Sequence, residues 1–320
     1  TDVFSIVTAD KSIQFILLVP DTKYDFFKDT YSKENVEVVA VKNDVLTKTR
    51  TAKFFSIWSH LLIDSHYLWY KRRERLETNK TVRGFLKYGF EMTITKLISG
   101  RHIMHPLFRK LFLEFGRQSE IKLIFDKYSP DCVFSTDAFD ESDVLFAGEA
   151  KRRGIKLISM VRSWDNCFSK GLLRVIPDKL IVNNETLKEE AVSFHDVSSE
   201  NVAVLGSPQY DNFTRAVRTP REQFFKQTNL DPNKKLIIFA PAGAILSDTD
   251  WQIATVLKEA VESNQFIFPV QFLVRNHPNH PADLSAIKGR ADMVIENPGK
   301  VFNKQNPKET ELTKNDSRHL

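Results

Sequence analysis

The chain has 320 residues, of which 42% are hydrophobic and 27% charged, with a formal net charge of +5 at pH 7. This length suffices for two domains, and the composition is that of an ordinary globular protein. Glycine is scarce, with 11 copies against 25 of phenylalanine, and neither GxGxxG nor GxxxxGKS/T occurs, which excludes a glycine-rich phosphate loop and indicates an aromatic core.

Charge, cysteine content and hydrophobic runs narrow the partners and the compartment. The sequence has no basic module with aromatic residues interleaved at fixed spacing, so we expect no nucleic-acid partner. The two cysteines, Cys132 and Cys167, lie far apart, which argues against a disulfide framework or a zinc site and favours a reducing compartment. No run of about 20 apolar residues occurs. We therefore expect a cytoplasmic protein, with peripheral contact to the inner face of the membrane left open.

The N-terminal part predicts a strand–helix–strand unit and then a helical region. The continuous apolar run at 13–20 predicts a buried parallel strand, and "VEVVAV" at 36–41 predicts a second one after a short helix. Residues 51–126 carry apolar side chains at helical spacing and predict a helical insertion. Within it, residues 66–80 combine aromatic and basic side chains. A helix packed on the core is favoured there, and contact with a membrane surface stays open.

From residue 131 onward, strands and helices alternate. The sequence predicts strands at 131–137, 155–161, 178–184 and 201–206, with helices at 141–154 and 185–195. Alternation every ~20 residues is typical of a doubly wound parallel sheet.

The pattern then starts again. Thr219 and Glu222 form a candidate capping box for a helix, and strands follow at 236–241, 270–278 and 291–297, with one clear helix at 250–263. We therefore predict an α/β protein with two Rossmann-like doubly wound domains, 1–215 and 216–320. A complete second domain of this type is nearly twice as long, so we expect this one to be incomplete.

Residues after the strands of the second domain are candidates for binding phosphate, because ligands of open parallel sheets bind at the carboxyl ends of the strands. Arg275 offers a bidentate fork for phosphate, and His277 supplies a donor or a proton near neutral pH. Gly243, in the loop after the first strand of this domain, is a further phosphate-binding candidate. The alternative is that Arg275 forms a salt bridge and His277 caps a turn.

The loop "RSWDNCFSKG" follows the strand at 155–161 and supplies candidates in the first domain. Asp165 can accept a proton from an attacking hydroxyl, and Trp164 can stack on a sugar or pack at a domain interface. Ser163, Asn166 and Lys170 are candidates for contacting the acceptor. The alternative is that Asp165 and Asn166 only satisfy donors of the loop backbone.

The loop "STDAFDESD" at 135–143 holds several carboxylates. Asp137, which ends the strand, is the catalytic candidate, whereas Asp140 and Glu141 suit a helix N-terminus. Cys167 has no evident His partner in the sequence and is interpreted as a small structural residue rather than a nucleophile.

Between about residues 130 and 280 the chain resembles the two-domain GT-B glycosyltransferases. The segments that carry this likeness are, in order, "GIKLISMVRSWDNCFSKG", "PDKLIVNNETLKEEAVSFH", "VAVLGSPQYDNF", "LDPNKKLIIFAP" and "LVRNHPN". "SWDN" with a following "KG", and "GSPQYD", point to the branch of CDP-glycerol glycerophosphotransferase-like and surface-polysaccharide enzymes.

This resemblance implies a cleft between two Rossmann-like domains. The C-terminal domain would bind the nucleotide diphosphate of a donor through Arg275 and His277, and the N-terminal domain would hold the acceptor near Asp137, Trp164 and Asp165. It also implies that no metal or other cofactor is needed for the transfer. Members of the family continue beyond the position of Leu320 into a loop and an acidic residue that grip the donor, so we expect a C-terminal truncation.

The sequence thus predicts a transferase that moves a glycosyl or glycerophosphate group from a nucleotide-sugar or CDP-glycerol-type donor to a hydroxyl acceptor, a lipid-linked one included, in cell-surface polysaccharide assembly. Asp165 or Asp137 would act as the base, and Arg275 with His277 would stabilise the departing phosphate. Two alternatives stay open. One is a non-hydrolysing nucleotide-sugar epimerase, and the other is a catalytically inactive GT-B-like binding protein.

Overall fold

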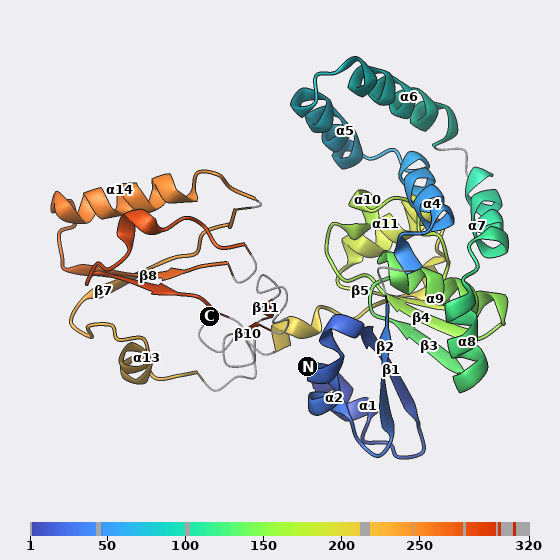
Figure 1. Ribbon diagram of the computed structural model, residues 1–320, viewed down its shortest axis with the longest axis horizontal. Coiled ribbons are helices and arrows are strands. Elements are labelled where there is room, and N and C mark those ends of the chain that lie inside the picture. Colours follow the sequence, from blue (N-terminus) through green and yellow to red (C-terminus); the bar gives the residue numbers. More distant parts are fainter. Residues whose placement is uncertain are drawn as a thin grey trace. The chain divides into compact units, whose positions relative to one another are not determined.

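The computed structural model describes residues 2–42, 46–99, 103–211, 218–244, 246–277, 280–298, 300–301 and 310–311. The chain forms two compact units (Figure 1), and each is described by itself. Unit 1 consists of Thr1–Asp21 and Lys33–Asp211, and unit 2 of Thr22–Ser32 and Asn212–Leu320. The sequence placed the boundary after residue 215 and assigned the whole N-terminal segment to the first domain, whereas residues 22–32 group with unit 2.

Unit 1 is centred on a parallel four-stranded sheet in the order β3-β4-β5-β6. Alternating side chains such as Leu157, Leu180 and Val182 are buried on one face of it. Helix α9 packs on β3 and β4, and α11 packs on β5 and β6. The strands are β3 (Cys132–Ser135), β4 (Lys156–Met160), β5 (Lys179–Val182) and β6 (Val202–Val204), and the helices are α9 (Glu141–Arg152), α10 (Asn166–Ser169) and α11 (Glu185–His195). Short 3-10 turns lie at Ser199–Asn201 and Pro208–Tyr210.

Local capping explains where these helices begin. The Asp140 carboxylate accepts the backbone N–H groups of Ser142 and Asp143 at the start of α9. The Asn184 side chain accepts from the N–H of Leu187 at the start of α11. Each cap satisfies donors that the first turn of a helix leaves without partners.

The N-terminal residues form a separate parallel strand pair, with Phe15 opposite Val36. Its elements are α1 (Asp2–Val7), β1 (Phe15–Pro20), a 3-10 turn (Asp21–Lys23), α2 (Tyr24–Tyr31) and β2 (Val36–Val41). The buried Asn35 side chain donates to the carbonyl groups of Thr8, Asp10 and Ile13, which ties the turn before β1 to β2.

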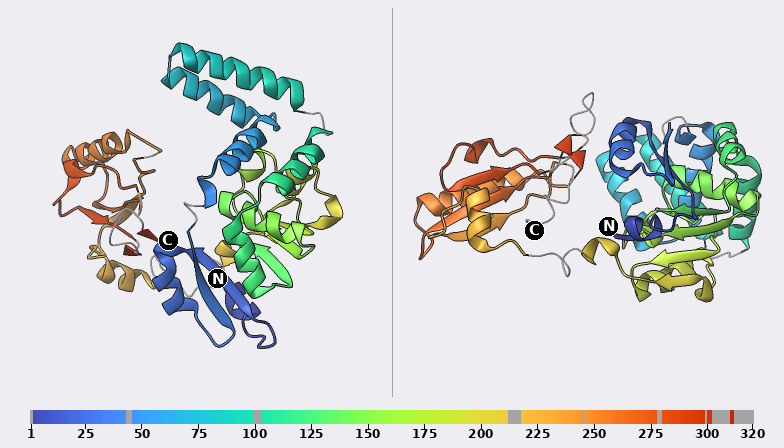
Figure 2. Two further views of the ribbon diagram at one scale, coloured as in Figure 1. Left: turned by 45° about the vertical axis from the view of Figure 1, so that its right-hand side comes forward. Right: turned by 90° about the horizontal axis from the view of Figure 1, so that it is seen from below.

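Five helices occupy the region where the sequence predicts a helical insertion. They are α4 (Arg50–Leu61), α5 (His66–Thr78), α6 (Val82–Ile98), α7 (Met104–Phe115) and α8 (Ser119–Tyr128). Helices α7 and α8 pack on α9, while α5 and α6 run side by side as a hairpin that extends away from the sheet (Figure 2). The core beneath them is aromatic, as predicted, since the ring of Phe55 meets those of Phe108 and Phe112 edge to face at 5.5 and 5.2 Å.

Unit 2 contains a parallel three-stranded sheet in the order β7-β8-β9. Its elements are α13 (Arg221–Gln227), β7 (Lys235–Phe239), α14 (Asp250–Glu262), β8 (Val270–Arg275), a 3-10 turn (Ser285–Ile287) and β9 (Met293–Glu296), with a small antiparallel pair of β10 (Lys300–Val301) and β11 (Thr310–Glu311). Every residue of the central strand β8 is buried. Helix α13 starts after Pro220 without a side-chain cap, so the predicted N-cap at Thr219 is wrong.

Parallel sheets with connecting helices in both units confirm the predicted α/β fold class. Among the described residues, no helix is both long and apolar enough to span a bilayer.

Candidate functional site

Asp137 and Asn166 meet at the carboxyl edge of the four-stranded sheet. Asp137 follows β3, and Asn166 opens α10 after the neighbouring strand β4. The Nδ2 atom of Asn166 lies 3.4 Å from Oδ1 of Asp137, and the same oxygen accepts the backbone N–H of Phe139 at 3.0 Å. Because adjacent parallel strands end at the same edge, two candidate residues from separate loops come into contact.

The surroundings of Asp137 make its carboxyl more basic than usual. Burial raises the pKa of Asp137, and the charge of Asp140 raises it further. The N–H of Phe139 and the positive charges of Arg162 and Lys170 oppose this effect without cancelling it. A carboxylate with a raised pKa is a better proton acceptor, which suits a general base. The sequence named Lys170 but missed Arg162, although Arg162 opens the same loop.

Asp165 has different partners. Its Oδ1 atom accepts from the Ser163 hydroxyl at 2.5 Å and its Oδ2 atom from the Ser169 hydroxyl at 2.9 Å. Burial acts to raise the pKa of Asp165, but hydrogen bonds from these two hydroxyls outweigh it and hold the pKa below its usual range. The carboxylate therefore braces its own turn, and of the two candidates Asp137 has the environment better suited to a base. A catalytic role for Asp165 stays a prediction.

The helical insertion positions the rest of this loop. The Ser65 hydroxyl, at the N-cap of α5, donates to the carbonyl of Phe168 at 2.6 Å. Gly171 has φ +82°, and a Cβ atom there would lie 2.9 Å from the carbonyl carbon of Ser59, so only glycine fits. Trp164 stays 71% exposed, with its ring centroid 6.0 Å from that of Phe168. An exposed indole on a braced loop is available to stack on a sugar, the role predicted for it.

The other acids of "STDAFDESD" are structural. Asp140 caps α9, and Glu141 forms an ion pair with the buried Arg174 at 2.8 Å. The Oδ2 atom of Asp143 accepts from the Ser135 hydroxyl at 3.1 Å and from the N–H of Asp137 at 3.0 Å. Asp143 thus holds the backbone of the candidate base in place.

Neither metal nor thiol chemistry is indicated by the described part of the chain. Over those residues, no group of three or more His, Cys, Asp and Glu side chains has the arrangement of a metal site. Cys167 is fully buried, and burial raises the pKa of its thiol to about 12, so the sulfur stays protonated at neutral pH.

Arg275 lies at the carboxyl edge of the sheet in unit 2. It ends β8, is buried, and places Nη1 at 2.7 Å from Oε2 of Glu296 at the end of β9. This ion pair is the salt bridge that the sequence left open as an alternative. Binding of phosphate by Arg275 stays a prediction.

Asn276, which the sequence analysis did not select, organises the turn that carries His277. It is buried, and its Oδ1 atom accepts the N–H groups of His277 and Ala282 at 3.1 and 2.9 Å. The Nδ1 atom of His277 accepts the N–H of His280 at 3.0 Å, and the two imidazole rings stack with centroids 5.2 Å apart. Neutral His277 therefore carries its proton on Nε2.

Gly243 lets the loop after β7 approach this turn. Its φ is +90°, and a Cβ atom would lie 2.5 Å from the carbonyl oxygen of His280 and 2.9 Å from Cβ of His277. The N–H of Gly243 donates to the buried Asp250 carboxylate at 2.8 Å. The contacts of Gly243 thus shape the loop, and its role in binding phosphate stays a prediction.

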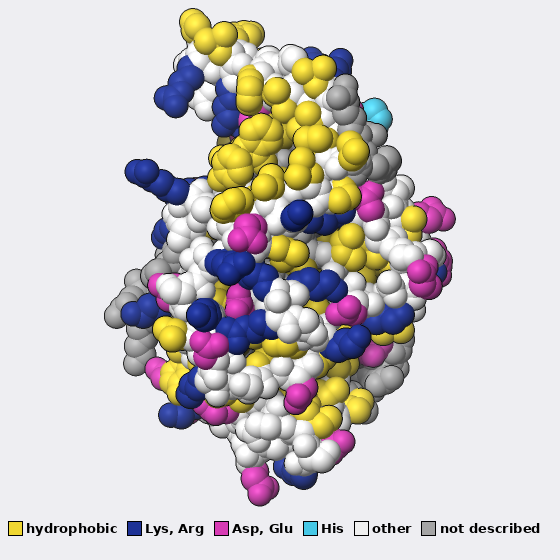
Figure 3. Space-filling view, turned by 90° about the vertical axis from the view of Figure 1, so that its right-hand side faces the viewer, with side chains coloured by type: hydrophobic (Ala, Val, Ile, Leu, Met, Phe, Trp, Pro, Cys, Tyr) yellow, Lys and Arg dark blue, Asp and Glu magenta, His cyan; other side chains and the backbone are white. Residues whose placement is uncertain are grey.

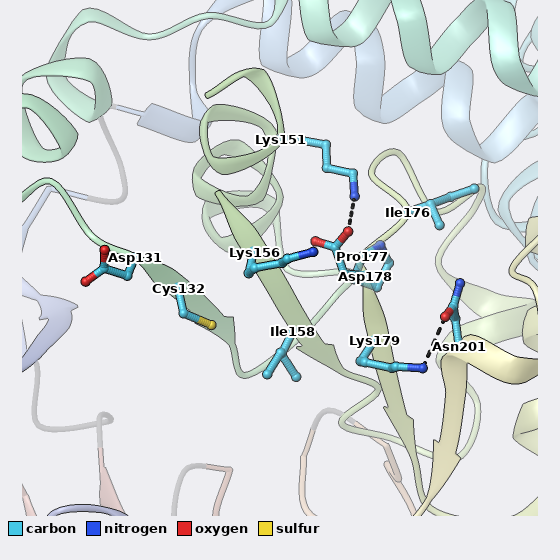
Figure 4. A pocket seen from close by; sticks show the side chains of 10 residues that line it. All are labelled: Asp131, Cys132, Lys151, Lys156, Ile158, Ile176, Pro177, Asp178, Lys179 and Asn201. Carbon is cyan, nitrogen blue, oxygen red and sulfur yellow. Dashed lines mark hydrogen bonds and ion pairs between the residues drawn. The ribbon is translucent and has the colours of Figure 1, made fainter. Parts of the chain in front are cut away.

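A pocket lies at the opposite edge of the four-stranded sheet, where the strands begin (Figure 4). Lys151 forms an ion pair with Asp178 at 3.0 Å, and Lys179 donates to the Asn201 side chain at 3.2 Å. The N–H of Leu157 and the charge of Lys151 hold the pKa of Asp178 below its usual range. Lys151 and Lys179 thus already have polar partners within the pocket. Because ligands of parallel sheets bind at the edge where the strands end, we assign no reaction to this pocket.

Comparison with known proteins leaves the family unassigned. No protein-family model matches the sequence, and a search of curated proteins gives no match. Solved structures similar to this chain include a Listeria monocytogenes protein assigned as a UDP-N-acetylglucosamine 2-epimerase, with a TM-score of 0.41 and 14% identity over 63% of this chain and 54% of that one. They also include a UDP-N-acetylglucosamine 2-epimerase from Rickettsia bellii (TM-score 0.37, 13% identity, 89% and 68% of the chains). A glycosyltransferase from Rickettsia africae is similar to the same degree (TM-score 0.37, 14% identity, 91% and 70%).

This chain spans about half the length of the Listeria protein, 54%. At these TM-scores and identities the likeness assigns no function, and the function is argued from the residues of the two sheet edges.

Proposed function

We propose that this protein is a transferase that moves a glycosyl or glycerophosphate group from a nucleotide-activated donor to a hydroxyl acceptor. The observation that carries the proposal is Asp137, a carboxyl with a raised pKa at the carboxyl edge of β3, hydrogen-bonded to Asn166. The resemblance of "SWDN" and "GSPQYD" to GT-B enzymes of surface polysaccharides supports the choice of substrates.

The proposed reaction is a direct displacement. The acceptor hydroxyl gives its proton to Asp137 while its oxygen forms a bond to the transferred group. The bond between that group and the nucleotide phosphate breaks, and the electron pair leaves with the phosphate. Arg162 and Lys170, whose charges act on Asp137, are the basic residues of this edge that would attract an anionic donor. No metal or other cofactor takes part in this scheme.

The departing phosphate is assigned to the turn after β8. With Nδ1 of His277 accepting from His280, the proton on Nε2 is the one that would be donated to a phosphate oxygen. Asn276 holds this turn through two backbone N–H groups.

The finer assignments follow the resemblance. A nucleotide sugar or CDP-glycerol serves as the donor, the acceptor hydroxyl belongs to a growing surface polysaccharide that is lipid-linked, and the reaction takes place in the cytoplasm.

Transfer assays with UDP-, CDP- and GDP-activated donors and a polyol or glycan acceptor test the proposal. Asp137→Asn keeps an oxygen acceptor but removes the base, and we expect it to lower kcat by about a hundredfold or more with little effect on KM. His277→Ala should abolish transfer with an unchanged circular dichroism spectrum. Ile267→Ala, at a side chain that is 95% exposed in unit 2, is the matched control and should retain full activity. Undiminished turnover in both active-site variants would exclude the proposed roles.

A nucleotide-sugar epimerase is the second candidate, because the stacked His277 and His280 lie at one sheet edge, where an imidazole can take up or give a proton. Incubation with UDP-N-acetylglucosamine in the absence of an acceptor separates the two activities. Conversion of the sugar under these conditions would favour the epimerase over the transferase.

A further inference from the structure

Helix α6 exposes its apolar stripe instead of burying it. Val82, Leu86, Phe90 and Leu97 follow one another at helical spacing and are all exposed, Leu86 to 70%. The only side chain that α6 buries in the described structure is the polar Thr95. A surface helix of a globular protein normally shows the reverse arrangement, with its apolar stripe toward the core. We therefore expect another molecule to cover this exposed stripe.

The segment after α6 continues this surface. Ile103, Leu107, Leu111 and Phe115 recur every four residues along α7 and its first flanking residue, and all are exposed, Ile103 to 80%. Figure 3 shows hydrophobic side chains gathered over the upper part of this face, at the height of α4, α6 and α7, with Lys and Arg beneath them. Contiguous apolar surface of this kind marks an interaction site.

The charge of this region is strongly positive. Of the seven Lys and Arg residues at 80–115, Arg109 is buried and pairs with Asp196 at 2.9 Å, so six remain against two Glu residues, a formal excess of +4. Both acids are paired with arginines outside the segment, Glu91 with Arg75 at 2.5 Å and Glu114 with Arg117 at 3.5 Å. The six basic residues are Lys80, Arg83, Lys87, Lys96, Arg101 and Lys110.

Helix α5, for which the sequence left contact with a membrane surface open, is less suited to such contact. Lys71 and Arg73 pair with Glu74 and Glu77 within the helix, at 2.8 and 2.9 Å. Arg72 is buried and donates to the carbonyl of His60 at 2.7 Å. The basic residues of α5 are thus largely matched locally, and its contribution lies in exposed Trp69 and Tyr70, residue types enriched at membrane interfaces.

We infer that the exposed stripes of α6 and of residues 103–115 dock on an anionic lipid bilayer. Apolar and aromatic side chains flanked by Lys and Arg match the acyl boundary and the negative headgroups of such a surface. A second copy of this chain fits less well, because a two-fold contact sets the same surface against itself and so opposes two positively charged regions. The docking does not depend on the proposed transferase activity, although it would bring a lipid-linked acceptor to the enzyme.

Vesicle cosedimentation with the full chain tests the inference. Vesicles of phosphatidylcholine with about 30% phosphatidylglycerol should bind the protein, and binding should weaken with added salt and on pure phosphatidylcholine. Arg83→Gln and Lys96→Gln should each lower the partition coefficient about fivefold. Leu86→Gln with Phe90→Gln should lower it at least about tenfold, because two inserted side chains are lost. Ile267→Gln, the control, removes an exposed apolar residue of unit 2 and should leave the partition coefficient unchanged.

Thermal unfolding by circular dichroism shows whether each variant is folded. No binding to anionic vesicles by the parent chain, or binding unchanged in the α6 variants, would overturn the inference. Light scattering without lipid measures the oligomeric state of the protein independently of vesicle binding. A dimer formed without lipid and dissolved by Leu86→Gln with Phe90→Gln would show that a second copy covers the stripe, and this too would overturn it.

Discussion

Lowering the pH should destabilise unit 1 through a single buried histidine. His195 ends α11 and is fully buried. Its Nδ1 atom accepts the N–H of Leu173 at 3.1 Å, and Nε2 lies 2.7 Å from the carbonyl oxygen of Cys167, to which it donates. These two bonds fix one neutral tautomer. Burial, with the charge of Arg109 acting in the same direction, lowers the pKa of His195 from 6.5 to about 4.

The size and sign of the effect follow from this shift. The unfolded chain takes up a proton on His195 as the pH falls through 6.5, whereas the folded protein does so only near pH 4. Stability contributed by the neutral ring is therefore fully present above pH 6.5 and is lost progressively between pH 6.5 and about 4. At 1.36 kcal/mol per pKa unit, the loss is about 3 kcal/mol.

Urea denaturation across this pH range measures this loss of stability. Other groups also titrate there, so the informative quantity is the difference between the parent chain and His195→Gln, which keeps a donor toward Cys167 but cannot be protonated. We expect the variant to be less stable at pH 7, because the Leu173 N–H loses its acceptor. The difference in free energy of unfolding between the parent chain and the variant should narrow by about 3 kcal/mol at pH 4. A difference in free energy of unfolding that stays constant with pH would refute the assigned effect of His195.

Two further predictions concern the turn at the edge of the unit 2 sheet. Gly243→Ala should destabilise the protein by about 1–3 kcal/mol in urea denaturation, because φ is +90° and the new Cβ atom would meet the His280 carbonyl; unchanged stability would contradict this close approach. Asn276→Ala should destabilise the protein by about 1–3 kcal/mol, because the buried N–H of Ala282 and the partly buried N–H of His277 lose their acceptor, whereas Asn276→Asp, which keeps that acceptor, should cost less; equal losses would argue against the assigned bonds.

Elements were predictable where one local signal fixes them. The helix at 185–195 was predicted with both ends correct, because Asn184 caps its first turn and the apolar residues Leu187 and Ala191 recur at helical spacing. Apolar runs located the strands, although β4 and β5 bury only alternate residues whereas β8 is buried along its whole length. The separate grouping of residues 22–32 with unit 2 has no comparable local signal in the sequence.

Side-chain roles were less predictable, because the choice of partner depends on the fold. Asp165 and Asp137 are both loop acids in the sequence, yet Asp165 has two serine hydroxyls as partners whereas Asp137 is raised in pKa by burial. The predicted cap at Thr219 failed because α13 begins one residue later and lacks a side-chain cap. Asn276 was missed because its bonds to the backbone form only once the turn after β8 closes.

The central claim is that a nucleotide-activated donor binds at the turn carrying His277, and calorimetric titration with UDP, CDP and GDP tests it most directly. The account predicts binding of one nucleotide with a Kd of about micromolar order, weakened at least about tenfold in His277→Ala and unchanged in Ile267→Ala. Absence of binding by all three nucleotides, or equal affinity in the parent chain and His277→Ala, would contradict it.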